Sequence, residues 1–221
     1  MVNIESYIQQ LIDLLNKQFG SRLLYVGLQG SYLRAEATDN SDIDIMVVLD
    51  ELTVSDLAHY RSLIESMEHT EKSCGFICSK SDLANWNPLE IWNLVNGTKD
   101  YFGKLRTYVP AYTEQDICNF AKLSLNNLYH EICHRYVHAV NHKSMEALAG
   151  SYKGVFYILQ HLYYLQNHEF IGTKQGLLSQ LKDDHHAVME RSIALCNGEQ
   201  HDFDESFELL LRWCQQTLQQ L

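Results

Sequence analysis

The chain has 221 residues, 46% of them hydrophobic, and carries 28 acidic against 17 basic side chains. No apolar run approaches the roughly 18 residues of a membrane-spanning helix, so the composition indicates a water-soluble globular protein of one or two domains, without a membrane partner. The formal charge of -11 opposes nonspecific binding to polyanions, and we expect no stable nucleic-acid partner.

The first residues, MVNIESYIQQLIDLL, contain neither a basic segment nor a small-residue cleavage site. We therefore expect no secretory signal and a cytoplasmic location. The six cysteines lack Cys-x-x-Cys spacing, and several lie at apolar positions of expected helices or strands. A reduced thiol at such a position behaves as a small hydrophobic side chain, so we expect free cysteines.

The first half of the chain alternates helical and strand patterns. Apolar residues recur at helical spacing over residues 4–19 and are followed by Gly20, which predicts an amphipathic helix with a glycine at its end. Short apolar runs predict three strands, and the segments between them predict helices. The predicted strands are RLLYVGL (22–28), IDIMVVLD (43–50) and SCGFICS (73–79), and the predicted helices cover 54–68 and the segment from Ser81, interrupted at Pro88.

From Tyr112 onward the apolar residues recur at helical spacing, and no segment shows a clear strand pattern. Pro110 marks the expected junction, which gives a first domain over 1–109 and a second over 110–221. The second domain is predicted to be an all-α helical bundle. Its expected helices are 115–140, 144–168, 174–182, 185–197 and 203–220.

The stretch GSYLRAEATDNSDIDIMVV, residues 30–48, carries the clearest chemical signal. Alternate residues of a strand share a face, so Asp42 and Asp44 should point the same way. Two convergent carboxylates repel each other unless a divalent cation lies between them, and hard oxygen ligands favour Mg²⁺. Gly30 permits close backbone approach, and a helix beginning at Ser31 would direct N–H groups at an anion. The stretch therefore predicts adjacent metal and phosphate sites.

Gly-Ser followed by Asp-x-Asp resembles the signature of the DNA polymerase β-type nucleotidyltransferase superfamily. The wider stretch is similar to small bacterial members, including the aminoglycoside nucleotidyltransferases, which often have Gly-Ser-x-x-Arg-Gly before Ser-Asp-x-Asp. Ala35 replaces the second glycine of that pattern. The resemblance implies an α+β nucleotidyltransferase fold, a short mixed sheet with helices, followed by the helical bundle.

The activity implied by the resemblance is Mg²⁺-dependent transfer of a nucleoside monophosphate, AMP from ATP in the first instance, onto a hydroxyl of a small molecule. An aminoglycoside-like antibiotic is one such acceptor, and pyrophosphate would leave. The family usually adds a third carboxylate on a later strand, but residues 73–79 contain none. Asp82, Glu90 and Glu131 are the alternatives for a general base, and we assign Glu131.

Three basic residues match positions at which relatives hold the triphosphate. Arg34 occupies the Arg position of the family pattern, one turn after Ser31. Lys153 lies near the start of an apolar helix, and Lys174 follows Thr173, which caps the next one. Solvated surface side chains are the alternative interpretation for all three.

The sequence HEICH satisfies the zinc-protease pattern, with His130 and His134 around Glu131. Ligands on one straight helix cannot close a tetrahedral site alone, and no third ligand at a family spacing follows. We favour a polar helix face that lines an interdomain cleft, where His134 and Arg135 would contact nucleotide or acceptor.

Two further functions stay open at this point. One is a noncatalytic or regulatory nucleotide-binding protein that has kept the fold, and the absent strand carboxylate favours it. The other is AMP transfer to a protein, as in the antitoxin branch of the superfamily. Neither the acceptor nor the preferred nucleotide follows from the residues.

Overall fold

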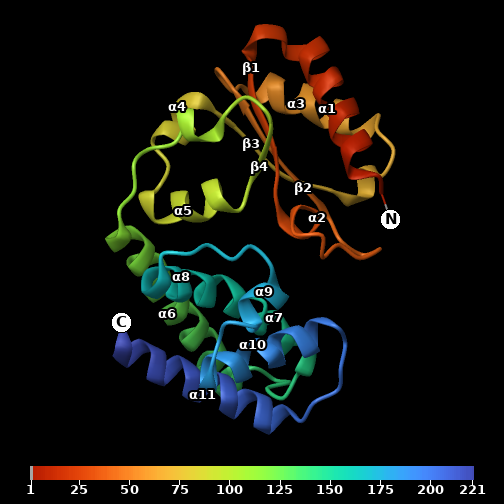
Figure 1. Ribbon diagram of the computed structural model, residues 1–221. Helices are drawn as coiled ribbons and strands as arrows, with labels where there is room; N and C mark the ends of the chain where they lie inside the picture. Colours follow the sequence, from red (N-terminus) through yellow and green to blue (C-terminus); the bar gives the residue numbers. More distant parts are fainter. Residues whose placement is uncertain (1) are drawn as a thin grey trace. The chain divides into compact units, whose positions relative to one another are not determined.

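The computed structural model describes residues 2–221, which divide into two compact units (Figure 1). The units are Met1–Tyr112 and Thr113–Leu221, and each has its own hydrophobic core. The division lies close to Pro110, where the helical half of the sequence begins.

The N-terminal unit contains a four-stranded mixed sheet in the order β3-β2-β1-β4. β1 is antiparallel to both β2 and β4, whereas β2 and β3 run parallel. This sheet confirms the expected short mixed sheet and its three predicted strands. The fourth strand was not predicted, because its four residues, KDYF, include two charges and form an edge. The strands are β1 Leu23–Leu28, β2 Ile43–Leu49, β3 Ser73–Ser79 and β4 Lys99–Phe102.

Helices cover both faces of this sheet, as Figure 1 shows. On one face, α1 buries Ile8, Leu11 and Leu15 completely against β1 and β2, as its helical spacing predicted. The other face packs Met46 and Val48 against residues of α4 and the segment after β4. Strand β2 is therefore buried on both sides. The helices are α1 Ile4–Phe19, α2 Gly30–Leu33, α3 Val54–Glu65, α4 Lys80–Ala84 and α5 Pro88–Asn96, with short 3₁₀ turns at Gly20–Arg22, Thr70–Lys72 and Leu105–Thr107.

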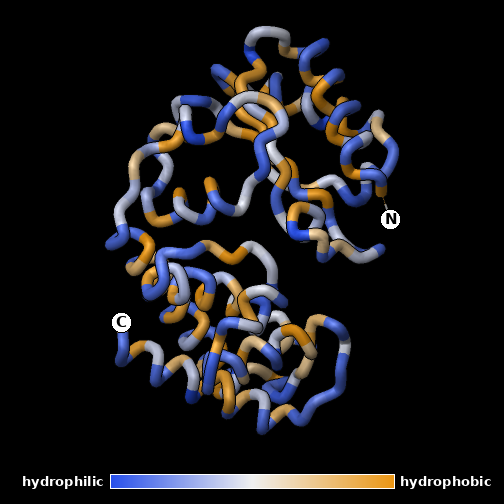
Figure 2. The backbone as a smooth tube through the Cα atoms, viewed as in Figure 1, coloured by the Kyte–Doolittle hydropathy of each residue, from blue (hydrophilic) through white to orange (hydrophobic). Residues whose placement is uncertain are grey.

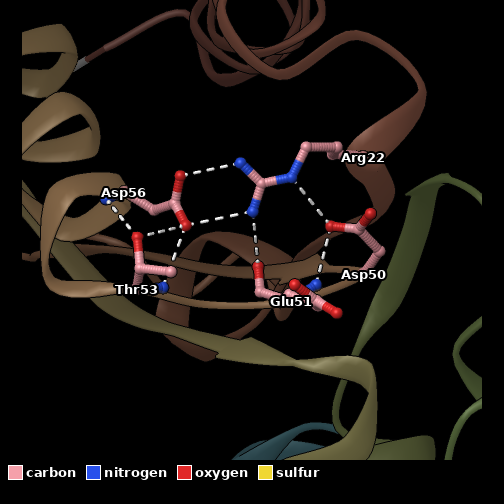
Figure 3. Close-up of polar contacts among 5 residues, drawn as sticks. All are labelled: Arg22, Asp50, Glu51, Thr53 and Asp56. Carbon is pink, nitrogen blue, oxygen red and sulfur yellow. Dashed lines mark hydrogen bonds and ion pairs between the residues drawn. The ribbon is translucent and has the colours of Figure 1, made fainter.

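A cluster of polar contacts around Arg22 fixes one end of the sheet (Figure 3). The Arg22 guanidinium donates to both carboxylate oxygens of Asp56, at 2.8 and 3.0 Å, and to Asp50 Oδ1 at 3.0 Å. Asp56 also closes the capping box of α3 with Thr53. Arg22 holds the pKa of the Asp56 carboxyl well below its usual range. The cluster thus ties the start of β1, the end of β2 and the start of α3 together.

We predict that Asp56→Asn reduces the acid sensitivity of the N-terminal unit. Because the pKa of Asp56 is lowered in the folded state, its stabilising contribution is present above the usual value of 3.8 and is lost as pH falls below it. In a Trp213→Phe background the remaining tryptophans, Trp86 and Trp92, both report on this unit. Urea unfolding followed by their fluorescence should show a smaller loss of unfolding free energy between pH 6 and pH 2.5 in the variant.

The matched control is Asp13→Asn, which neutralises an exposed carboxylate on α1. It should keep the full acid sensitivity of the parent. An equal loss in parent and Asp56→Asn would show that the Arg22 ion pair does not set the acid response.

The C-terminal unit is helical throughout, which confirms the expected all-α region. Its hydrophobic core includes fully buried Tyr152, Phe156 and Trp213. Figure 2 shows hydrophobic and hydrophilic residues alternating along α11, the pattern of a helix with one buried face. The helices are α6 Glu114–His138, α7 Met145–Tyr152, α8 Val155–Asn167, α9 Lys174–Leu178, α10 Asp183–Cys196 and α11 Phe203–Gln220.

The single helix expected over 144–168 is wrong, because the chain breaks at Lys153 and Gly154 between α7 and α8. Their N–H groups bond three residues back, to Gly150 and Ser151, which tightens the turn. Two glycines four residues apart, Gly150 and Gly154, weaken helical continuity at this point. An apolar helical pattern on both sides hid the break from the sequence.

All six cysteines are free, as expected, and those at Cys78 and Cys214 are buried among apolar side chains. Within residues 2–221, no helix has the length and apolar character that crossing a membrane requires.

Candidate active site

The two motif aspartates lie at the start of β2. Asp44 shares a face with Met46 and Val48, while Ile43 and Ile45 point into the opposite core and are buried. Asp42 directly precedes the strand and is exposed. The start of a strand that is buried on both sides therefore carries one partly buried carboxylate, Asp44, next to an exposed one, Asp42.

The pKa of Asp44 is raised, and burial is the main cause. A hydrogen bond from the Cys74 thiol opposes the rise, repulsion from Asp42 adds to it, and the positive charge of Arg34 opposes it. In the protein alone, ionised Asp44 is thus electrostatically unfavourable. A cation beside Asp42 and Asp44 would remove this cost.

Gly30 lies directly against Asp44. A β-carbon at this position would come within 1.9 Å of Asp44 Oδ2, and the φ angle of Gly30, +69°, belongs to the left-handed region. The preceding residue, Gln29, donates its N–H to the Asp44 carbonyl oxygen at 2.9 Å. Only glycine allows the turn to approach the carboxylate so closely. The one-turn helix α2 follows and includes Ser31.

Arg34 and Glu36 form an ion pair beside this turn. Arg34 Nε donates to Glu36 Oε2 at 2.9 Å, and both side chains are largely shielded from water. Between them, Ala35 adopts a left-handed conformation, with φ +57°. The Glu36 N–H then returns to the Ser31 carbonyl oxygen, at 2.9 Å. Ala35 thus has the backbone conformation that the glycine of the family pattern would adopt without strain.

We predict that Ala35→Gly stabilises the N-terminal unit by about 0.5–1 kcal/mol. A left-handed conformation costs an L-residue roughly 1–2 kcal/mol, and glycine avoids this cost. Glycine loses more backbone entropy on folding, which offsets about 0.5–1 kcal/mol of that gain. Urea unfolding in the Trp213→Phe background measures the difference. Ala37→Gly is the control, since the φ of Ala37 is not positive, and it should destabilise. Equal destabilisation by both substitutions would contradict the strain at Ala35.

Cys74 occupies the position on β3 beside Asp44. The parallel pairing of β2 with β3 sets Asp44 opposite Cys74, and the thiol acts to lower the pKa of the Asp44 carboxyl. No side chain of β3 is a carboxylate. Among residues 2–221, no group of three or more His, Cys, Asp or Glu side chains is arranged to hold a metal ion. A cation here would have Asp42 and Asp44 as its protein ligands.

Sequence reasoning missed Cys74, Glu36 and Gln29. The parallel register of β2 and β3 would have placed Cys74, but a register is not visible in a single sequence. Glu36 comes close to Arg34 only through the left-handed turn at Ala35. The missing family glycine at that position was the available signal.

The other expected site residues lie in the C-terminal unit. Glu131 on α6 accepts hydrogen bonds from Arg135 Nη2 and Ser151 Oγ through one oxygen, each at 2.9 Å. His134 is exposed, and its ring lies between those of His130 and His138, at centroid distances of 5.8 and 4.8 Å. These rings follow one helix face, without a third metal ligand from another element among the described residues.

The two predicted lysines lie elsewhere in the same unit. Lys153 is exposed in the break between α7 and α8, and Lys174 is the first residue of α9. Thr173 caps α9, accepting the Gly176 N–H at 3.2 Å, as expected. The structure therefore gathers Gly30, Ser31, Arg34, Asp42 and Asp44 in the N-terminal unit, and places the remaining candidates on the helical one.

The family model described as nucleotidyltransferase domain matches residues 8–102, which include β1, β2, β3, β4 and the Gly30 turn. This part of the chain is therefore similar to nucleotidyltransferase domains. The resemblance of GSYLRAEATDNSDIDIMVV to this superfamily is thereby confirmed.

Two individual proteins are similar to the chain. A Methanocaldococcus jannaschii protein, provisionally named a protein adenylyltransferase, is 49% identical over 43 residues, which are 20% of this chain and 43% of that protein. The chain thus matches less than half the length of this relative. The crystal structure of the spectinomycin adenyltransferase AAD(9) from Enterococcus faecalis, with ATP and spectinomycin, matches with a TM-score of 0.62 over 98% of this chain and 100% of that one. At 13% identity, this second similarity shows a shared fold.

Proposed function

We propose that the protein transfers a nucleoside monophosphate, AMP from ATP, to a hydroxyl group of a small molecule and releases pyrophosphate. The observation that carries the proposal is the contact of the Gly30 turn with Asp44, beside Asp42, within a nucleotidyltransferase domain. An aminoglycoside-like antibiotic is the first acceptor to test, because the similar AAD(9) structure contains spectinomycin. The cytoplasmic location stays a prediction.

Asp42 and Asp44 suit an Mg²⁺ ion whose remaining coordination positions are filled by water and substrate oxygens. Asp44 is partly buried, its pKa is raised, and Asp42 repels it, so the positive charge of Arg34 compensates the pair only in part. Two carboxylates are too few for an all-protein cage but suit an ion shared with phosphate oxygens. When bound, Mg²⁺ would supply charge neutralisation at the triphosphate and activation of the acceptor hydroxyl.

The residues of the chain have distinct parts in this proposal. Gly30 and Ser31 bring the backbone close to the triphosphate, and Arg34, Lys153 and Lys174 pair with its oxygens. Asp42 and Asp44 hold the metal. Glu131 accepts the acceptor's hydroxyl proton, and the donors Arg135 and Ser151 orient its carboxylate. His134 and Arg135 contact the acceptor or nucleotide.

Two alternatives each have a specific observation in their favour. Strand β3 lacks the third carboxylate that the family usually has on a later strand, and Cys74 is the residue beside Asp44, which favours nucleotide binding without catalysis. The 43-residue similarity to a protein provisionally named a protein adenylyltransferase favours a protein acceptor. ATP with Mg²⁺ should raise the melting temperature more than either alone under every one of these functions, so turnover must distinguish them.

The deciding experiment is a screen for Mg²⁺-dependent pyrophosphate release with each of the four nucleoside triphosphates. Hydroxyl-bearing small molecules, spectinomycin and aminoglycosides among them, form one arm. A second arm follows label transfer from α-labelled ATP to proteins of a cell extract. Release with a small molecule supports the proposal, label on protein alone supports the protein acceptor, and ligand-dependent stabilisation without turnover supports the binding protein.

We predict that Asp44→Asn separates stability from activity. The raised pKa means that ionised Asp44 destabilises the folded state above that pKa, and this effect vanishes when the group is protonated at low pH. At pH 7.5 without metal, the melting temperature should therefore stay level or rise. Transfer should fall at least about a hundredfold, because a charged metal ligand is lost.

Asp39→Asn is the matched control for Asp44→Asn, since it neutralises a carboxylate in the loop that leads to β2. It should leave transfer near the parent rate. Near-normal transfer by Asp44→Asn, or unfolding of this variant in the absence of metal, would overturn the assigned role.

We predict that Lys153→Ala weakens ATP binding much more than adenosine binding. The proposed partners of its exposed ammonium group are phosphate oxygens, which adenosine lacks. Isothermal titration with both ligands measures the two losses, and Lys122→Ala on α6 is the control lysine. Equal losses for ATP and adenosine would remove Lys153 from the triphosphate site.

A further inference from the structure

Arg34 lies one turn after Gly30, the residue that lies against Asp44, and its N–H bonds to the Gly30 carbonyl oxygen at 3.4 Å. Its Nε contacts Glu36 Oε2 at 2.9 Å. Its charge also acts on Asp44, where it opposes the rise in the pKa of that carboxyl. A guanidinium binds carboxylates strongly, often through two parallel hydrogen bonds. Arg34 is therefore a built-in cation that can compete with a metal ion for Asp44.

The pairing of Arg34 with Glu36 is a product of the turn. Residues two apart do not face each other on a helix, but the left-handed Ala35 reverses the chain after α2. The Glu36 N–H closes the turn on the Ser31 carbonyl oxygen. The Arg34 and Glu36 side chains are 17% and 23% exposed, so water and salt screen this pair less than a fully exposed one.

We propose that Glu36 is a positioning residue for the cation site, which holds Arg34 away from Asp44 and so leaves the carboxylates of Asp42 and Asp44 to the metal ion. This inference rests on the proposed function, because it assigns these two aspartates to a metal. Glu36 itself does not touch the metal. Its effect on metal binding is exerted through Arg34, and that dependence makes the inference testable.

The test is Mn²⁺ binding in the absence of nucleotide, followed by electron paramagnetic resonance of the free ion. Glu36→Gln should weaken Mn²⁺ binding about five- to tenfold, because Arg34 loses its ion pair with Glu36 and can then pair with Asp44. In an Arg34→Gln background the same substitution should change binding less than about twofold, since the competitor is gone. Melting temperatures without metal establish that each variant is folded.

Glu36→Asp provides a second variant that retains the charge but shortens the side chain by one methylene. If Glu36 acts by holding Arg34, this variant should also weaken Mn²⁺ binding. Asp39→Asn neutralises a different carboxylate in the same loop, and its effect on Mn²⁺ binding should be equal in both backgrounds.

An equal effect of Glu36→Gln with and without Arg34 would overturn the inference, as would normal Mn²⁺ binding by Glu36→Asp. Failure of the proposed function gives a different result. In that case the parent protein would bind no Mn²⁺, or its binding would be insensitive to Asp44→Asn.

Discussion

The contact between the Gly30 backbone and the Asp44 carboxylate is the constraint on which the candidate site depends. It brings a turn that can approach an anion against a carboxylate that can hold a cation. The arrangement places a partly buried carboxyl group beside a second one, so that ionisation of Asp44 is less favourable than in water. Strand β2 tolerates it because six of its seven residues are buried, and each buried aliphatic side chain stabilises by about 1.5–3 kcal/mol. The core of the domain thus offsets the electrostatic cost at one end of its central strand.

Much of the fold could be predicted because its signals are local. The spacing of Ile8, Leu11 and Leu15 fixed the buried face of α1, and short runs rich in β-branched residues identified three strands. Strand β4 lacks such a run and is held by pairing with β1 at the sheet edge. The break at Lys153 and Gly154 was missed although Gly150 and Gly154 weaken the helix locally, because the flanking segments have the same helical pattern.

The candidate site divides in the same way. Gly30, Asp42 and Asp44 lie within one short motif, so their spacing predicted adjacent phosphate and metal sites. Cys74 lies beside Asp44 because β3 pairs with β2, and this pairing joins residues that are distant in the chain. Glu36 lies within the motif, yet its contact with Arg34 depends on a backbone angle at Ala35 that no side-chain pattern records. Local sequence therefore predicts the charged groups better than it predicts which of them restrain the others.

The Arg22 cluster lies at the opposite end of β2 from Asp44, and the strand joins the two over about 20 Å. One end is fixed by three carboxylate contacts and a capped helix, whereas the other carries mutual repulsion and an exposed loop. Local opening of the sheet should consequently begin at the aspartate end and become rarer toward Val48. Amide hydrogens along β2 would then exchange with solvent in a graded series, fastest beside Asp42 and Asp44, so that a metal ion held there, as proposed, would act on the part of the strand with the greatest freedom to move.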